Sequence, residues 1–350
     1  MMGKTIVGVD ISANGLRAVE LGDATKARPT LLRHHSVALP PGAVSRGEVV
    51  EPSTVATAMK QLWSTGGFTG KDVIIGIGNS RVLARDLSVP KASLKRIRES
   101  LPFQVQEMLP FPTEDALLDF YPISESDSET GPVVNGLLVA AVKEAVLGNV
   151  NAVQLAGLRP VEVDLVPFAL SRVLLRGANS SGTTAVIDVG ASTTIVIVCT
   201  EGVPQFVRII PTGGDDLTTA LSTRLGIPME NADALKRSTG LAATANSAEQ
   251  AEVLRIMFEL TSELVTSLRN TLSYFASSRQ GDVVERIILA GGGAQLAGFA
   301  EALGEFTRLS VSRGNPFETL DISRKIDQAD LDQRGSSLAV AIGLALGSAA

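Results

Sequence analysis

The sequence of 350 residues is poor in cysteine, histidine and aromatic residues. Its one cysteine, Cys199, lies in an apolar segment, which excludes a disulfide scaffold and favours core packing over a catalytic thiol. The two histidines, His34 and His35, are adjacent and would point to opposite faces of a strand, so they cannot chelate one ion together. These absences argue against thiol chemistry and against a cysteine or histidine metal centre.

Positive charge and long apolar runs are also lacking. The 31 Lys and Arg residues are outnumbered by 37 Asp and Glu, and no basic stripe alternates with aromatics, which argues against nucleic-acid binding. No run reaches the ~18 apolar residues that a membrane span needs, and the N-terminus shows no charged-then-apolar leader. We therefore expect a cytoplasmic protein that meets the membrane through a partner.

What is present is an ordinary folded composition, with 45% hydrophobic and 19% charged residues. A chain of this length is too long for one compact core and predicts two domains or more.

A motif in the middle of the chain indicates a binding site. An apolar run ends at Asp188, followed by Gly190, Ser192 and Thr193 and then by a second apolar run. This pattern predicts a tight strand-turn-strand in which the aspartate can hold a hydrated cation. Exposed amides and hydroxyls beside it can hold phosphate oxygens. An ordinary hairpin with an aspartate in its turn fits the pattern equally well.

The chain begins with the same pattern, because an apolar strand ends at Asp10 and is followed by Ser12 and Asn14. The two aspartates open corresponding hairpins in the two halves of the chain. The favoured interpretation is a duplicated α/β domain whose copies present their hairpins to one shared cleft.

Between the two hairpins, a first sheet is followed by a segment of different texture. It has a proline-interrupted helix, a loop rich in Ser, Glu and Asp, and a closing helix and strand, which together predict a small inserted α+β module. In order, the expected elements of this segment are a strand at 82–90, a helix at 93–108, strands at 117–124 and 134–142 around the loop 124–132, a helix at 144–156 and a strand at 159–165.

The second half carries two glycine-rich turns. Gly213 and Gly214 open a helix whose N-terminus is expected to be free to face an anion. Further on, a buried strand at 287–290 runs into Gly291, Gly292 and Gly293. A tight strand-to-helix turn needs one or two glycines, so the third favours a flat ring lying on the backbone.

Taken in order, these turns resemble the actin-like ATPase superfamily, which includes actin, the large heat-shock chaperones, sugar kinases and FtsA. The resemblance implies an α/β fold of duplicated RNase H-like domains around a nucleotide cleft, with an FtsA-like inserted α+β subdomain. It implies ATP and Mg²⁺ as cofactors, with Asp10 and Asp188 near the metal through water. Asp233 and Lys236 match positions that contact ribose and base in relatives, although a surface ion pair explains them as well. The nucleotide-binding residues implied by the resemblance are Asp10, Ser12, Asn14, Arg17, Asp188, Gly190, Ser192, Thr193, Gly213, Gly214, Asp233, Lys236, Gly291, Gly292, Gly293 and Gln295.

Finer features resemble the PilM family of type IV pilus assembly proteins within that superfamily. They include the segment 109–112 followed by Glu114 and Asp115, the segments 156–158 and 167–170, and the apolar end at 338–346. The resemblance implies an ATP-binding scaffold that holds the N-terminal tail of a PilN-like inner-membrane protein in a groove between the first and inserted subdomains. Other pilus platform proteins and self-association are further implied contacts.

The expected division of the chain follows from this resemblance. It consists of a first actin-like domain at 1–81, the inserted subdomain at 82–166, a connecting helix and loop at 167–182, a second actin-like domain at 183–335 and a closing helix at 336–350 that packs back on the first domain.

Three positions depart from the superfamily pattern. Ser12 stands where glycine is usual, and Arg17 where related proteins often carry lysine. Val166 stands where relatives that hydrolyse ATP well have Glu or Gln to orient the attacking water, and valine cannot hold a water. We therefore expect a protein that binds ATP and hydrolyses it slowly or not at all.

Three alternatives stay open at this point. A sugar-type kinase of the same fold would need a catalytic aspartate that the inserted module does not supply. An FtsA-like filament former would carry a basic amphipathic helix at its end, whereas this sequence finishes in the small residues 347–350. A fold with an empty cleft is the third.

Overall fold

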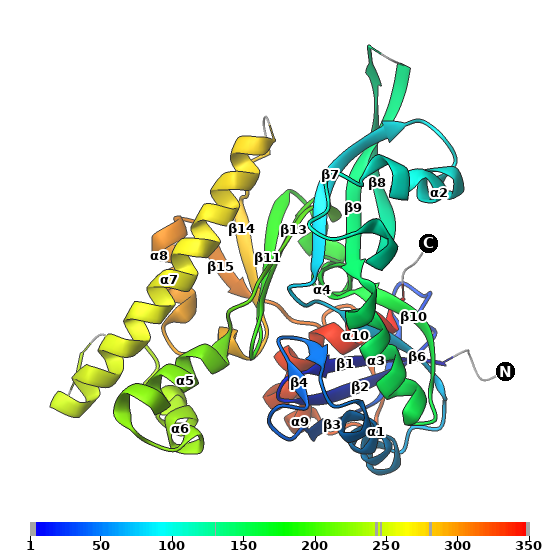
Figure 1. Cartoon of the computed structure of the whole chain (residues 1–350). Helices are drawn as coiled ribbons and strands as arrows, with labels where there is room; N and C mark the ends of the chain where they lie inside the picture. Colours follow the sequence, from blue (N-terminus) through cyan, green and yellow to red (C-terminus); the bar gives the residue numbers. More distant parts are fainter. Residues whose placement is uncertain (1–4, 130, 242–243, 246, 280–281, 348–350) are drawn as a thin grey trace.

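Two open sheets, whose strands follow the same order and directions, form the body of the protein (Figure 1). In this computed structural model the described residues are 5–129, 131–241, 244–245, 247–279 and 282–347. The strand order is β10-β6-β1-β2-β3-β16 in the first sheet and β15-β14-β11-β12-β13 in the second. In each sheet an antiparallel three-strand meander continues into two parallel strands. The duplicated α/β architecture is therefore confirmed.

The strands at the centre of both sheets are apolar because both of their faces are covered. All residues of β11 are buried, and so are all but the last of β12. The first sheet consists of β1 (Thr5–Ser12), β2 (Gly15–Gly22), β3 (Thr30–Ala38), β6 (Asp72–Ile77), β10 (Arg159–Leu165) and β16 (Asp321–Ile322). The second consists of β11 (Thr183–Val189), β12 (Thr194–Thr200), β13 (Val203–Ile210), β14 (Arg286–Ala290) and β15 (Ser310–Arg313).

Helices cover the outer faces and fill the space between the sheets. Helices α1 and α3 share a hydrophobic core with the first sheet, α5 to α8 share one with the second, and α4 and α10 lie in a central core between them. The helices are α1 (Pro52–Gly66), α2 (Leu94–Gln104), α3 (Lys143–Leu155), α4 (Val166–Leu174), α5 (Gly214–Leu225), α6 (Met229–Thr239), α7 (Ala248–Ser278), α8 (Phe299–Thr307), α9 (Gln328–Arg334) and α10 (Ala339–Ala345). Short 3₁₀ turns occur at Thr113–Asp115, Gly177–Ser180, Gly293–Gln295 and Gly335–Leu338.

Helix α10 packs so closely against its neighbours that glycine is required at two contacts. A Cβ atom on Gly8 of β1 would lie 2.1 Å from the carbonyl oxygen of Ala341, and one on Gly343 would lie 2.0 Å from that of Ala169 in α4. Every residue of α10 is buried, as predicted for a packing helix. Within the described ranges, none of the helices combines the length and the apolar character that a bilayer crossing requires.

A small sheet of order β7-β9-β8 projects from the first sheet and carries α2 on a core of its own (Figure 1). Its strands are β7 (Val82–Pro90), β8 (Ala116–Ser128) and β9 (Gly131–Val142). The predicted loop at 124–132 is wrong for most of its length, because β8 and β9 stay paired out to Ser128 and Gly131. Since the outer end of this hairpin is exposed on both faces, its strands show no apolar alternation.

Two elements that the sequence assigned to the inserted module, α3 and β10, pack with the first sheet. β10 pairs in parallel with β6 and so joins the first sheet, and α3 packs against α1 of that sheet. Two parallel strands need a crossover connection, and the small sheet together with α3 forms it. The strand pattern at 159–165 was predicted correctly but assigned to the wrong sheet. The limits of the five segments stay a prediction.

Candidate functional site

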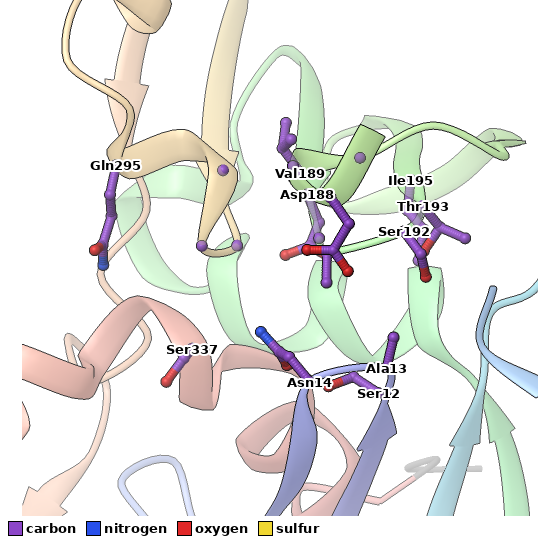
Figure 2. Close-up of a pocket in the computed structure, with 18 of the residues that line it drawn as sticks. Ser12, Ala13, Asn14, Asp188, Val189, Ser192, Thr193, Ile195, Gln295 and Ser337 are labelled. Carbon is purple, nitrogen blue, oxygen red and sulfur yellow. Dashed lines mark hydrogen bonds between the residues drawn. The ribbon is translucent and has the colours of Figure 1, made fainter. Parts of the chain in front are cut away.

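One cavity of about 520 Å³ lies between the two halves of the molecule. Its size lies within the range of roughly 300–1,000 Å³ that is typical of small-molecule sites. The strand ends that carry the two aspartates face each other across it, and Figure 2 shows Asp188, Ser192 and Thr193 opposite Ser12 and Asn14. Every residue that the sequence assigned to a nucleotide site lines this cavity: Asp10, Ser12, Asn14, Arg17, Asp188, Gly190, Ser192, Thr193, Gly213, Gly214, Asp233, Lys236, Gly291, Gly292, Gly293 and Gln295.

The first hairpin, β1–β2, is organised by Arg17. Its guanidinium donates to the Asp10 carboxylate at 3.2 Å, to the Ser12 hydroxyl at 2.8 Å and to the Asn14 side-chain oxygen at 3.0 Å. Burial raises the pKa of Asp10, and the nearby Arg17 charge opposes that rise. The arginine therefore does more than replace a lysine, because its planar fork holds the whole turn in one conformation.

The second hairpin, β11–β12, has no such cation. Its turn is closed by a hydrogen bond from the Gly190 amide to the Thr193 carbonyl oxygen at 2.9 Å. Within the described ranges no ion pair reaches Asp188. Burial, reinforced by the charge of Asp10, raises the pKa of Asp188 to about 7 despite the opposing Arg17. A buried carboxylate in this state gains strongly from an added cation.

The glycine run after β14 lies directly against the second hairpin. A Cβ atom on Gly291 would lie 2.9 Å from a carboxylate oxygen of Asp188, and one on Gly293 would lie 2.4 Å from a side-chain carbon of Val189. At Gly292, by contrast, a Cβ atom would meet nothing within 4 Å. Two of the three glycines are thus required by the fold, and Gly292 is the one that leaves open space in the cavity.

The N-terminus of α5 differs from its expectation. The amide of Gly214 donates to the Gly190 carbonyl oxygen at 3.0 Å, and that of Asp215 to the Ala191 carbonyl oxygen at 2.7 Å. The Gly213 amide donates to the Asp216 carboxylate at 2.7 Å. The expectation of a free helix end facing an anion is therefore wrong, because the second hairpin and a side-chain cap already use these donors.

Asp233 and Lys236 form an ion pair on the wall of the cavity. Lys236 lies 2.8 Å from the Asp233 carboxylate and donates to the carbonyl oxygen of Gly214 at 3.1 Å and to the Thr218 hydroxyl at 2.6 Å. Partial burial disfavours the charged form of Asp233, but hydrogen bonds from Lys236 and Arg237 outweigh it and lower its pKa. The pair is an ion pair and also lines the cavity, so it is compatible both with a structural role and with a contact to ribose or base.

Several residues that line the cavity were not predicted. They include Gly47, Gly76 and Gly78 of the first half and the neighbouring residues Ser336 and Ser337 before α10. The Gln295 side chain donates to the Ser336 hydroxyl at 2.5 Å, which joins the two halves. The glycines carry no local signal of their own, whereas two adjacent serines before a wholly apolar helix could have been noticed.

Val166 forms an apolar part of the cavity wall. It is the first residue of α4, lines the cavity and is buried. A Cβ atom on Gly76 or Gly78 would lie within 2.9 Å of its side chain, so the valine packs tightly against the end of β6. The cavity wall at this point is apolar.

In the described part of the chain, no group of three or more His, Cys, Asp or Glu residues is arranged so that it could hold a metal ion. Asp10 and Asp188 are the two carboxylates at the hairpin ends, so a cation here would take its remaining ligands from water or from a bound anion.

Two repeated sheets with opposed hairpins around one cavity define the actin-like ATPase fold. The match to MreB5 of Spiroplasma citri bound to AMPPNP shows the same fold, with a TM-score of 0.54 and 12% identity over 97% of this chain and 94% of that one. FtsA of Bacillus subtilis strain 168 is 20% identical over 306 residues, covering 80% of this chain and 68% of the relative.

Within this class the chain belongs to the family described as type IV pilus assembly protein PilM, whose sequence profile matches residues 8–349. The solved structure titled PilM-PilN type IV pilus biogenesis complex superposes with a TM-score of 0.83 and is 30% identical, covering 97% of both chains.

Proposed function

We propose that this protein is an ATP-binding scaffold of the inner-membrane platform of a type IV pilus, and that it holds the N-terminal tail of a PilN-like membrane protein. The observation that carries the nucleotide part is that all residues predicted for a nucleotide line one cavity between the two halves. Membership of the PilM family and the similarity to the PilM-PilN complex support the partner.

The residues present fit a magnesium nucleotide. Asp188 is a buried carboxylate without an ion-pair partner in the described residues, and its raised pKa marks a position that favours an added cation. Asp10 and Asp188 would hold Mg²⁺ through water. Ser12, Asn14, Ser192 and Thr193 would meet the phosphates, and the open surface of Gly292 would lie under the base.

We propose that binding rather than turnover is the role of the nucleotide. The apolar Val166 side chain occupies the wall at the position where a water-orienting residue would be needed. Bound ATP then acts by linkage, because a ligand that binds one conformation shifts the population towards it. The favoured conformation is the one that accepts the partner tail, in a groove between the first and the small sheet.

This assignment places the protein at the inner face of the cell membrane through its partner. It also predicts that the scaffold contacts other platform proteins and that it self-associates.

A calorimetric titration of the full chain with Mg·ATP tests the nucleotide part. Gly292→Val fills the cavity without disturbing the fold, because its Cβ meets nothing within 4 Å, and it should abolish binding. Gly70→Val is the matched control, since its Cβ also meets nothing within 4 Å and Gly70 does not line the cavity. Equal ATP affinity in both variants would refute the site.

The partner part is tested by titrating a synthetic N-terminal peptide of the PilN-like protein into the same chain with and without Mg·ATP. Binding should be stronger with the nucleotide. A peptide that binds equally well to the Gly292→Val variant and to the wild-type protein in Mg·ATP would contradict the proposed linkage.

A further inference from the structure

The hairpin β4 (Val44–Ser45) and β5 (Glu48–Val49) of the first half reaches across the mouth of the cavity to the second half. The guanidinium of Arg46 donates to the carbonyl oxygen of Pro211 and lies 3.9 Å from the carboxylate of Asp216. These two partners flank Gly213 and Gly214, which line the cavity. Arg46 therefore ties the hairpin to the segment that precedes α5.

The turn that presents Arg46 is a strained one. Arg46 and Gly47 have positive φ angles of 47° and 81°, a conformation that favours Asn-Gly and is unfavourable for arginine. Strain of this kind persists where surrounding contacts hold it, and it often accompanies function. Here it directs the Arg46 side chain across the cleft while Gly47 lines the cavity.

A buried donor lies directly under this turn. A Cβ atom on Gly47 would come within 3.2 Å of Asn79, which is fully buried and lies between the cavity-lining Gly78 and the start of β7. The Asn79 side-chain oxygen accepts from the Arg81 amide at 3.0 Å. Its side-chain nitrogen has no hydrogen-bond partner among the described residues. The turn therefore covers one unused buried donor, next in sequence to the cavity-lining Gly78.

The same hairpin is bonded to the root of the small sheet. The Arg81 guanidinium donates to Glu48 of β5 at 3.1 Å and to Glu144 of α3 at 3.0 Å. The Arg81 carbonyl oxygen accepts from the amide of Val142 at 3.1 Å. Both chain connections between the first sheet and the small sheet thus meet at Arg81, and the hairpin is attached to them.

We propose that the β4–β5 hairpin is a clasp over the phosphate end of the cavity, and that it couples closure of the cavity to the position of the small sheet. Arg46 binds the clasp to the second half. Glu48 binds Arg81 at the root of the small sheet, so a movement of the clasp moves this root. The assignment of this end to phosphate rests on the proposed function. The clasp deepens that function by supplying a route from the nucleotide to the lobe that receives the partner.

Hydrogen exchange by mass spectrometry on the full chain tests the clasp without nucleotide. Arg46→Ala should raise amide exchange in residues 211–216, and Glu48→Ala should raise it in residues 81–84 and 141–145 instead. Arg159→Ala is the matched control, because it removes an exposed arginine that pairs with Asp72 at the far edge of the first sheet. Exchange at 211–216 that is equal in the Arg46→Ala and Arg159→Ala variants would overturn the clasp.

The second arm adds Mg·ATP and a fluorescent ATP analogue. In wild-type protein the nucleotide should slow exchange at both the cleft and the root, and Arg46→Ala should release the analogue about fivefold faster. Glu48→Ala should keep the protection at the cleft and lose it at the root. Root protection that survives in Glu48→Ala would overturn the relay, and the Arg279–Asp86 ion pair at 2.5 Å, which also joins the second half to the small sheet, would be the next connection to remove.

The two proposals fail separately. If wild-type protein binds no Mg·ATP, the proposed nucleotide function is wrong, while the exchange measured without nucleotide still supports or overturns the clasp.

Discussion

The two hairpins at the cavity occupy the same place in two sheets of the same strand order, yet they differ in how the charge of their aspartate is balanced. In the first, Arg17 pairs with Asp10 at 3.2 Å and also binds the turn. In the second, the turn is held by backbone hydrogen bonds and by α5, and no ion pair of Asp188 is found in the described residues. The first hairpin thus contains the cation that pairs with its aspartate, and under the proposed function a bound ligand supplies one to the second.

The comparison shows that two copies of one fold can carry different charges at equivalent positions. Arg17 holds the turn of the first hairpin through several hydrogen bonds. In the second, burial raises the pKa of Asp188 to about 7, so its charged form would gain from a bound metal ion. The following predictions test this difference, from the largest expected effect to the smallest.

Removing each aspartate in turn should separate binding from stability. Asp188→Ala should weaken Mg·ATP binding about tenfold to a hundredfold, because it removes a charged ligand contact. It should not lower the free energy of unfolding, since the lost carboxylate is buried and uncompensated. Calorimetric titration and urea unfolding measure the two quantities.

The corresponding Asp10→Ala variant should lose about 2 kcal/mol of unfolding free energy, because it leaves Arg17 unpaired in a largely buried place. If both variants behave alike in both assays, the two hairpins do not differ in the way described.

Replacing Arg17 should make the first hairpin resemble the second. Arg17→Ala leaves Asp10 without its cation and frees the Ser12 and Asn14 side chains. We expect the free energy of unfolding to fall by about 2 kcal/mol in the absence of Mg²⁺, with part of the loss restored by Mg·ATP. Chemical denaturation with and without Mg·ATP measures this, and Arg28→Ala, which removes an exposed pair with Asp321, is the control.

Val166 offers a test of the proposal that the protein binds ATP without turning it over. Val166→Glu should raise ATP turnover at least about tenfold, because it adds a group that can orient and deprotonate water. Val166→Gln, which cannot act as a base, should give a smaller increase. Phosphate release measures turnover, and an unchanged rate in a Val166→Glu protein that still binds ATP would count against Val166 as the limiting residue.

Cys199 reports whether the second hairpin is looser than the first. It lies fully buried in β12, and burial raises the pKa of its thiol to about 12. Because the pKa is raised, the reactive thiolate is a minor species at pH 8, roughly one part in ten thousand. We expect no reaction with a disulfide reagent in native protein at pH 8 and full reaction after unfolding. Reaction in the native state would show that the second hairpin opens.

Much of the fold was predictable because its signals are local. The long helix α7, the meanders of both sheets and the buried closing helix follow from apolar periodicity and from glycine and proline positions. The sheet that β10 joins was not predictable, since its residues 159–165 have the same pattern whichever neighbour they find. The polar end of the β8–β9 hairpin was missed for a related reason, because exposed strands lose their alternation.

The residues that line the cavity were predicted largely through the turns that carry them. Asp10, Asp188 and the three glycines from Gly291 to Gly293 come together at one cavity because matching strand ends in two copies of a sheet must meet when the copies face each other. Ser336 and the glycine Gly47 were missed, since their place depends on how distant segments pack.

By itself the sequence determined the repeated hairpins, the glycine turns and the apolar Val166, because these depend on short-range backbone and side-chain chemistry. The tertiary structure alone decided which charges meet. Arg17 pairs with Asp10 and leaves Asp188 without an ion pair among the described residues, the donors at the start of α5 are already used, and Arg46 reaches the opposite half. Such pairings depend on distances of a few ångströms between residues far apart in the chain, and no local pattern encodes them.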